Sequence, residues 1–130
     1  KYQEFKKVNC EIYAISTDTH FAHKTWHDIS ENISKIEYPM IGDPTHSLTY
    51  DFDVFDENDG LAQRGSFIID PEGKIVVYEV NAGNVGRNAE ELLRRLHACQ
   101  FVYEHGNNVC PAKWKLGEKT IQTTIENIGK

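Results

Sequence analysis

A short apolar strand lies between two helical segments at the start of the sequence. Residues 1–8 place apolar side chains at helical spacing among polar neighbours, which predicts the end of an amphipathic helix. The run Cys10–Ser16 is rich in β-branched and aromatic residues and predicts a strand. A second helix is expected over residues 21–36, before Pro39. Because a helix that feeds a strand implies an earlier parallel strand, we expect an α/β fold whose first strands are missing from this chain.

The later pattern also alternates. Residues 43–52 predict a short helix that restarts at Asp43-Pro44. Residues 66–70 and 74–80 predict two strands, and the Pro and Gly between them predict a hairpin turn. A long helix is expected over residues 88–103. This alternation supports the α/β class.

The last predicted helix carries two further expectations. Asn88 and Glu91 have the spacing of a capping box. Arg94 and Arg95 fall opposite the apolar face and are expected to point into solvent. From Gly106 onward the sequence is polar and sparse in apolar residues, which predicts a mobile tail.

Composition excludes several classes of function. A length of 130 residues fits one domain, and the formal charge of −6 disfavours nucleic acid and anionic membrane surfaces as partners. The apolar runs are too short to span a bilayer. The sequence opens on no signal peptide, and its three cysteines form no C-x-x-C pair, so free thiols in the cytoplasm are expected.

Cysteine and arginine are the strongest candidates for chemistry. Cys10 and Cys99 fall on predicted strand and helix positions, where a free cysteine usually serves as a small apolar side chain. Cys110 follows a Gly-Asn-Asn loop, where a partner can reach the thiol, so both a redox and a structural role are open. Arg64 directly precedes a predicted strand and is either a solvated charge, a structural ion pair or a group that supports a thiolate and binds an oxygen-rich substrate.

Three histidines offer an alternative. His20, His23 and His27 share one side of a predicted helix, and three imidazoles can bind a transition metal. The H-E-x-x-H pattern is absent, which favours a helix face in contact with solvent or an interface over a metal site.

Several motifs together resemble one family. The matching segments run in order through the chain and are Ser16–Phe21, His23–His27, Met40–Thr45, Gly60–Arg64, Phe67–Pro71 and Val109–Trp114. They resemble the typical two-cysteine peroxiredoxins, and among these the branch of bacterial alkyl hydroperoxide reductase small subunits. The resemblance covers essentially all 130 residues. It implies a thioredoxin-like fold of which residues 1–130 are the C-terminal major part, with residues from about 104 to 130 as the C-terminal tail.

The resemblance also implies a chemistry. Members of this family reduce hydrogen peroxide and organic hydroperoxides: a peroxidatic thiolate becomes a sulfenic acid, and a resolving thiol of the partner subunit condenses with it. The resemblance implies no cofactor and no metal. It implies a homodimer, assembled into a decameric ring, and a flavoprotein disulfide reductase or thioredoxin as electron donor.

Individual roles follow from the same resemblance. Cys110 matches the resolving cysteine, and Arg64 matches the arginine that supports the peroxidatic thiolate and the peroxide. The segment Thr17–Phe21 and nearby Trp26 match the region that packs dimers into rings. Cys10 and Cys99 match no functional position.

The sequence departs from the family at the decisive residue. The Pro-x-x-x-Thr/Ser-x-x-Cys segment that carries the peroxidatic cysteine has no match here, so this chain alone is expected to be inactive. The Gly-Gly-Leu-Gly and Tyr-Phe motifs of oxidation-sensitive members are also missing, which implies resistance to over-oxidation. The competing hypothesis is a non-catalytic fragment that acts as a dimerisation or redox-relay module through Cys110.

Overall fold

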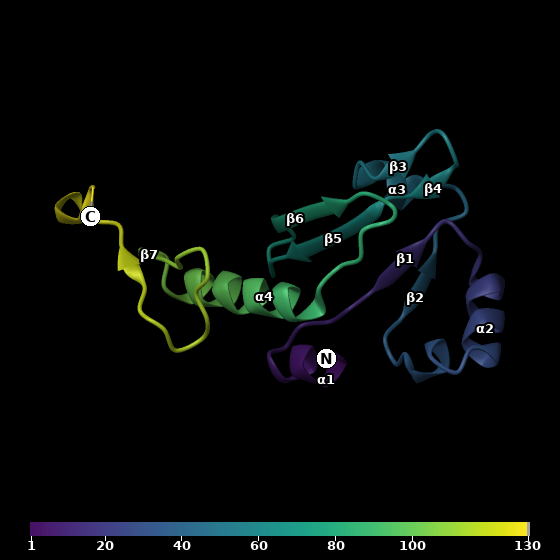
Figure 1. Ribbon diagram of the computed structural model, residues 1–130, viewed down its shortest axis with the longest axis horizontal. Coiled ribbons are helices and arrows are strands. Elements are labelled where there is room, and N and C mark those ends of the chain that lie inside the picture. The colour runs from purple at the N-terminus through teal and green to yellow at the C-terminus, as the bar shows by residue number, and fades with distance from the viewer. Residues whose placement is uncertain (130) are drawn as a thin grey trace. The chain divides into compact units, whose positions relative to one another are not determined.

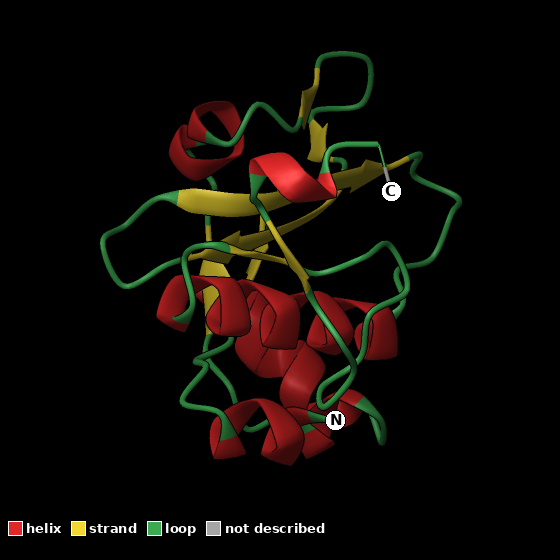
Figure 2. Cartoon of the chain, turned by 90° about the vertical axis from the view of Figure 1, so that its left-hand side faces the viewer, coloured by secondary structure: helices red, strands yellow, loops and turns green. Residues whose placement is uncertain are grey.

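The computed structural model describes residues 1–129, in which short helices and strands alternate (Figure 1, Figure 2). The chain divides into two compact units: the first comprises residues 1–66 and 79–87, and the second comprises residues 67–78 and the chain from Asn88 onward. Within the described residues the strands pair as four two-stranded sheets. No helix in this part of the chain is long and apolar enough to cross a membrane.

The first unit contains a parallel crossover. Strand β1 (Ala14–Ser16) leads into helix α2 (His20–Ile29), which returns the chain to β2 (Met40–Gly42) beside β1 in parallel register. The Thr19 hydroxyl accepts the Ala22 N–H and caps α2. The expected strand–helix alternation is confirmed here, because parallel neighbours require a crossover of this kind.

Strand β1 and helix α2 are both shorter than predicted. β1 begins at Ala14 instead of Cys10, because its partner β2 offers only three residues for pairing. The predicted helix over residues 21–36 ends at Ile29, and a 3₁₀ turn, η1 (Ile33–Lys35), follows it. The Ser30 hydroxyl accepts the Ile33 N–H, so a side chain takes the place of a helical backbone partner.

Gly42 lies where the loop before α2 crosses β2. A Cβ at this position would lie 2.7 Å from the Asp18 carbonyl oxygen and 2.9 Å from the His20 nitrogen. Both atoms belong to the backbone and cannot rotate away. The position therefore requires glycine for close approach of two backbone segments.

The predicted helix over residues 43–52 begins later, at Ser47, as α3 (Ser47–Asp51). The Asp43 carboxylate, buried at 3% exposure, accepts hydrogen bonds from the backbone of Leu48 and from both the N–H and the hydroxyl of Thr49. Burial would raise the pKa of this carboxyl, but the hydrogen bonds from Thr49 and Leu48 lower it below its ordinary value. Asp43 thus starts the helix from outside it, with Pro44 in the intervening turn.

The remaining elements of the first unit are short. Helix α1 spans Tyr2–Lys7 and buries Phe5, as the apolar spacing predicts. Strands β3 (Phe55–Asp56) and β4 (Leu61–Ala62) form an antiparallel pair. Val54 is the other buried apolar residue of this unit.

The predicted hairpin is confirmed. Strands β5 (Arg64–Ile69) and β6 (Ile75–Asn81) pair, and the turn between them belongs to the second unit. The Asp70 side chain accepts the Glu72 and Lys74 N–H groups, and Gly73 adopts φ +83°. Proline and glycine therefore serve the turn that their sequence predicts.

The second unit is built on helix α4 (Ala89–Glu104), with Leu93 and Leu96 buried. The Asn88 side chain caps it by accepting the Glu90 and Glu91 N–H groups. The reciprocal half of the predicted capping box is wrong, since the Glu91 carboxylate pairs with arginines of its own helix.

The tail that was predicted to be mobile contains regular structure. Strands β7 (Asn108–Val109) and β8 (Ile121–Gln122) pair antiparallel, and η2 (Ile125–Asn127) follows. Between the two strands lies Trp114, the most buried large side chain of the described residues at 2% exposure. Its ring lies 5.2 Å, centroid to centroid, from Phe101 of α4. A single aromatic residue thus orders a segment that is polar on average.

Candidate functional site

Cys110 lies directly after β7 and before Pro111, outside regular structure as predicted. The thiol is partly buried, and its Sγ lies 4.0 Å from the Ala98 carbonyl oxygen of α4. Burial raises the pKa of the Cys110 thiol above its ordinary value, while the charge of Arg94 acts in the opposite direction. Burial and a cation therefore act on this thiol in opposite directions.

The segment after Cys110 is held by backbone and side-chain bonds. The Trp114 N–H donates to the Pro111 carbonyl at 2.9 Å, and its indole Nε1 donates to the Glu118 carbonyl at 3.0 Å. The Glu118 carboxylate accepts the Lys115 N–H at 2.8 Å. The segment from Cys110 to Glu118 thus forms a loop around the buried indole.

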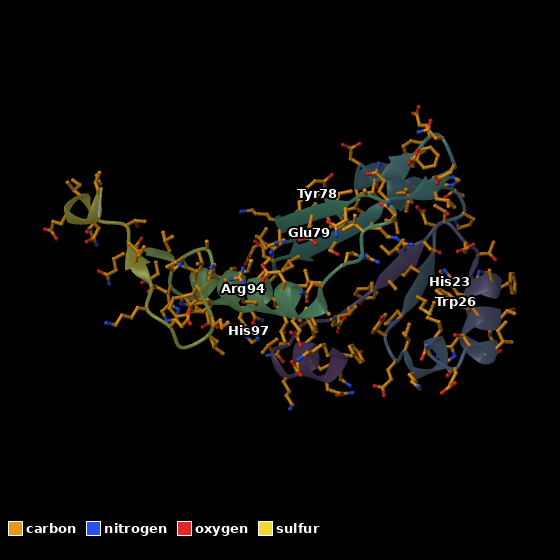
Figure 3. The ribbon with its side chains drawn as sticks, in the orientation of Figure 1. His23, Trp26, Tyr78, Glu79, Arg94 and His97 are labelled. Atoms are coloured by element: carbon orange, nitrogen blue, oxygen red, sulfur yellow. The ribbon has the colours of Figure 1, made fainter. Side chains whose placement is uncertain are left out.

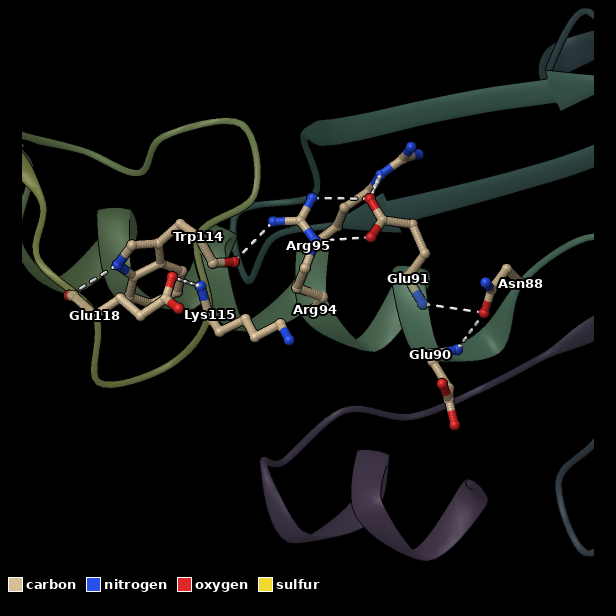
Figure 4. A network of polar contacts seen from close by, with 8 residues as sticks. All are labelled: Asn88, Glu90, Glu91, Arg94, Arg95, Trp114, Lys115 and Glu118. Carbon is tan, nitrogen blue, oxygen red and sulfur yellow. Dashed lines mark hydrogen bonds and ion pairs between the residues drawn. The ribbon is translucent and has the colours of Figure 1, made fainter.

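Arg94 connects this loop to α4 (Figure 4). Its Nε and Nη2 donate to the two oxygens of Glu91 at 2.7 and 2.8 Å, and its Nη1 donates to the Trp114 carbonyl at 2.8 Å. Hydrogen bonds from Arg94, and then from Arg95, lower the pKa of Glu91 to about 2 against the opposing effect of burial. The prediction that Arg94 points into solvent is wrong: its side chain is 22% exposed, because the loop packs over it.

Arg95 also differs from its prediction. Its side chain is 34% exposed, and its Nε donates to Glu91 at 2.9 Å. One carboxylate therefore holds two guanidinium groups on the same helix, at i+3 and i+4.

Arg64, expected directly before a strand, is the first residue of β5, and its side chain is exposed. Its Nε donates to the Gly83 carbonyl at 3.2 Å. In the opposite direction, Arg87 Nη1 donates to the Gly65 carbonyl at 2.7 Å. Two arginines thus join the start of β5 to the segment after β6, and the sequence pattern had nominated only the first of them.

The other two thiols are not activated. Burial, followed by the charge of Glu11, raises the pKa of Cys10, and burial followed by Cys110 raises the pKa of Cys99. Both side chains are partly buried. A thiol that attacks peroxide needs a lowered pKa, so none of the three cysteines has the electrostatics of a peroxidatic nucleophile.

The three histidines of α2 take separate partners. His27 Nε2 bonds to the Ile36 carbonyl, and the His20 ring lies against Phe21. The buried His23 bonds through Nε2 to the Ser16 hydroxyl at 2.7 Å, from α2 toward β1 (Figure 3). Within residues 1–129, no group of three metal-binding side chains is arranged to hold an ion.

A shallow cavity of about 300 Å³ lies beside these histidines. Lys24 and Asp28, which form an ion pair at 2.6 Å, line it together with Tyr38 and Met40. The Nδ1 atom of His23 is buried and has no hydrogen-bond partner among the described residues. The cavity wall is a mixture of charged and apolar groups, without a convergent set of ligands.

Comparison with known proteins places this geometry in a family. Residues 1–78 match the AhpC/TSA family, and residues 98–128 match the C-terminal domain of 1-Cys peroxiredoxin. Alkyl hydroperoxide reductase C of Escherichia coli strain K12 is 51% identical over 129 residues, which cover 99% of this chain and 69% of the relative. The chain belongs to the AhpC/TSA family of peroxiredoxins. The corresponding protein of Bacillus subtilis strain 168 is 50% identical over 130 residues, or 70% of its length.

Solved peroxiredoxins confirm the expected thioredoxin-like α/β fold. The crystal structure of Enterococcus faecalis AhpC matches with a TM-score of 0.82 and 53% identity, covering 85% of this chain and 66% of that one. Reduced Plasmodium vivax 2-Cys peroxiredoxin matches with a TM-score of 0.90 and 28% identity, covering 95% and 65%. The chain therefore spans about two thirds of the length of these peroxiredoxins.

Sequence reasoning missed the surroundings of the candidate residues in this peroxiredoxin. Arg94 and Arg87 were not nominated, although both bind backbone carbonyls in segments far along the chain. The signal in the sequence was weak: Glu91 and Arg94 at i, i+3 indicate an ion pair on a helix, but nothing in that spacing indicates Trp114.

Proposed function

We propose that this chain supplies the resolving thiol of a thiol-dependent peroxidase that reduces hydrogen peroxide and alkyl hydroperoxides, with Cys110 as the resolving residue. The observation that carries the proposal is the Cys110 environment: a partly buried thiol in a closed loop, beside the fixed charge of Arg94. A resolving thiol does not require the strongly lowered pKa that a peroxidatic thiol needs, and its raised pKa fits that role.

The proposed reaction has three steps. A peroxidatic thiolate attacks the hydroperoxide, the O–O bond breaks, an alcohol or water leaves, and the sulfur becomes a sulfenic acid. The Cys110 thiol of the partner subunit then attacks that sulfur, the S–S bond forms and the sulfenic oxygen leaves as water. A reductant dithiol then reduces this disulfide by thiol–disulfide exchange, which restores both protein thiols and leaves the reductant as a disulfide. Residues 1–130 contain no Pro-x-x-x-Thr/Ser-x-x-Cys segment, so the proposed reaction requires a peroxidatic thiol that these residues do not supply.

Arg64 is proposed to support the peroxidatic thiolate and the peroxide oxygens. Only its Nε carries a hydrogen bond to a described residue, so both terminal nitrogens of the guanidinium can donate to an oxygen-rich substrate. The bond from Arg87 to the Gly65 carbonyl fixes the strand on which Arg64 stands.

The proposal includes an assembly and a setting. We expect a homodimer, built further into a decameric ring, located in the cytoplasm and reduced by a flavoprotein disulfide reductase or a thioredoxin. Helix α2 supports ring assembly because it exposes three large apolar side chains, Phe21, Trp26 and Ile29 (Figure 3 labels Trp26). Exposed apolar clusters of this size mark protein interfaces.

A second candidate function is a redox-relay or dimerisation module that performs no peroxidase chemistry. For the 130-residue chain in isolation, the raised pKa values of Cys10, Cys99 and Cys110 argue against a peroxidatic nucleophile among them, which leaves this second function open. Peroxide consumption by the protein that also contains the peroxidatic segment separates the two, because the first candidate expects turnover there and neither expects turnover from the 130-residue chain alone. Absence of turnover in both forms favours the module.

The decisive experiment replaces Cys110 by Ser in the protein that also contains the peroxidatic segment. After peroxide treatment, the parent is expected to run as a disulfide-linked dimer on non-reducing gels and Cys110→Ser as a monomer. Cys99→Ser is the matched control and should keep the dimer. A dimer that persists in Cys110→Ser would remove the resolving role, and an unchanged peroxide rate in Arg64→Ala would reduce Arg64 to a structural ion.

A further inference from the structure

The strongest polar arrangement outside the proposed catalytic residues is the one around Arg94. The guanidinium uses three nitrogens: two clasp the Glu91 carboxylate and the third donates to the Trp114 carbonyl (Figure 4). A bidentate pair to a carboxylate fixes the plane of the guanidinium and not only its position. The third bond therefore reaches the Trp114 carbonyl from a rigid base on α4.

The loop that Arg94 grips begins at Cys110. The Trp114 N–H returns to the Pro111 carbonyl, so the grip on Trp114 is transmitted across one turn to the residue beside Cys110. The Cys110 Sγ itself lies 4.0 Å from the Ala98 carbonyl oxygen. Ala98 is at i+4 from Arg94, so the thiol contacts α4 one turn after the residue that grips its loop.

We propose that Arg94 is a positioning residue for Cys110, which holds the loop against α4 with the thiol beside a fixed positive charge. This inference rests on the resolving role proposed for Cys110. The purpose of the charge is to favour the thiolate, both when Cys110 attacks the sulfenic sulfur and when it later leaves during exchange with the reductant.

The groups that face this thiol are few. Arg94 is the cation, and it favours the charged form of Cys110 against the effect of burial. Cys99 is the other titratable neighbour, and the influence of Cys110 on it is repulsive. The charge of Arg94 is in turn stabilised by Glu91, whose hydrogen bonds are the largest cause of the raised pKa of that guanidinium.

The test measures the reactivity of Cys110 alone and needs no peroxide. In the protein that also contains the peroxidatic segment, Cys10→Ser, Cys99→Ser and replacement of the peroxidatic cysteine by serine leave Cys110 as the reactive thiol, and its rate of alkylation by iodoacetamide is followed across pH. Arg94→Gln removes the charge but keeps a donor for the Trp114 carbonyl. We expect its apparent thiol pKa to rise and its rate near neutral pH to fall about threefold to tenfold, the effect of a shift between half a unit and one unit.

Two further variants separate the effect of the Arg94 charge from other effects of the substitution. Arg94→Lys keeps the charge and is expected to return most of the parental pH profile. Arg95→Gln is the matched control, since Arg95 shares Glu91 while the bond to the Trp114 carbonyl comes from Arg94, and it should stay within about twofold of the parent.

Two outcomes would overturn the proposal. A parental profile in Arg94→Gln removes the role of the charge. A faster reaction with a lower apparent pKa means that Arg94 only buries the thiol, because release of the loop would remove the burial that raises the pKa. If tryptophan fluorescence shows that Arg94→Gln does not fold, the test rests on Arg94→Lys instead. A large displacement of the pH profile of alkylation in Arg94→Lys would then count against the proposal. The dimer assay on Cys110→Ser is independent of this measurement, so the two proposals fail separately.

Discussion

The β1–α2–β2 crossover and the loop from Cys110 to Glu118 are ordered by different means. The crossover is held by a parallel backbone ladder of three residue pairs and by a close backbone approach at Gly42. The loop has no ladder over its own length and is held by one indole and by side chains that bind its carbonyls and N–H groups. Helices and strands can be predicted from the periodicity of the sequence, whereas a loop that is held in place by one side chain cannot.

Trp114→Ala tests that dependence and has the largest expected effect. Removal of the indole leaves a cavity against Phe101 and releases the Glu118 carbonyl, so we expect a loss of about 3 to 5 kcal/mol of unfolding free energy. Denaturant unfolding measures it. Trp26→Ala, at a half-exposed position on α2, is the control and should cost far less. Equal losses at the two tryptophans would mean that the indole does not organise the loop.

Gly42→Ala tests the crossover. The added Cβ meets the Asp18 carbonyl oxygen at 2.7 Å, so backbone must shift and we expect a loss of about 1 to 3 kcal/mol. Thermal or denaturant unfolding measures it. Gly83→Ala is the matched control, because a Cβ there would meet nothing within 4 Å. A neutral Gly42→Ala would show that the loop before α2 yields easily.

Acid titration of Glu91 has the smallest expected effect, and it tests whether the carboxylate charge helps to hold Arg94 against the loop. The folded pKa of Glu91 is lowered from 4.5 to about 2, so its contribution is complete above pH 4.5 and is lost as the pH falls toward 2. Because the side chain is 35% exposed, solvent screening limits this contribution to about 1 kcal/mol or less. The unfolding free energy of the parent should exceed that of Glu91→Gln at neutral pH, and the two values should converge as the pH falls toward 2.

Glu57→Gln, at an exposed position, serves as the control for this titration. Its difference from the parent should not change with pH in the way that the Glu91→Gln difference does. A Glu91→Gln difference that is constant from neutral to acid pH would show that the carboxylate charge does not hold Arg94.

The extent to which sequence predicted each element follows from how local its cause is. The hairpin turn at Asp70–Gly73 and the Asn88 cap were predicted correctly, because the deciding bonds join residues within four positions. The start of β1 was wrong, since pairing with β2, more than 20 residues along the chain, decided it. The end of α2 was wrong although its cause is local, because the Ser30 hydroxyl accepts the Ile33 N–H and replaces a helical backbone partner.

The candidate site divides in the same way. Cys110 and Arg64 could be nominated from motifs, and the structure places the first after β7 and the second at the start of β5, as those motifs implied. The contribution of Arg94 could not be nominated, because its partner Trp114 lies 20 residues along the chain.

The sequence by itself determined the α/β class, the family and the residues that carry its motifs, because periodicity, turn chemistry and motif spacing are written in neighbouring positions. Only the tertiary structure decided that a polar tail buries Trp114, that Arg94 is covered, and that burial and the charge of Arg94 act together on Cys110. The physical reason is that burial and charge at a side chain are sums over whatever packs against it, and those neighbours come from distant parts of the chain.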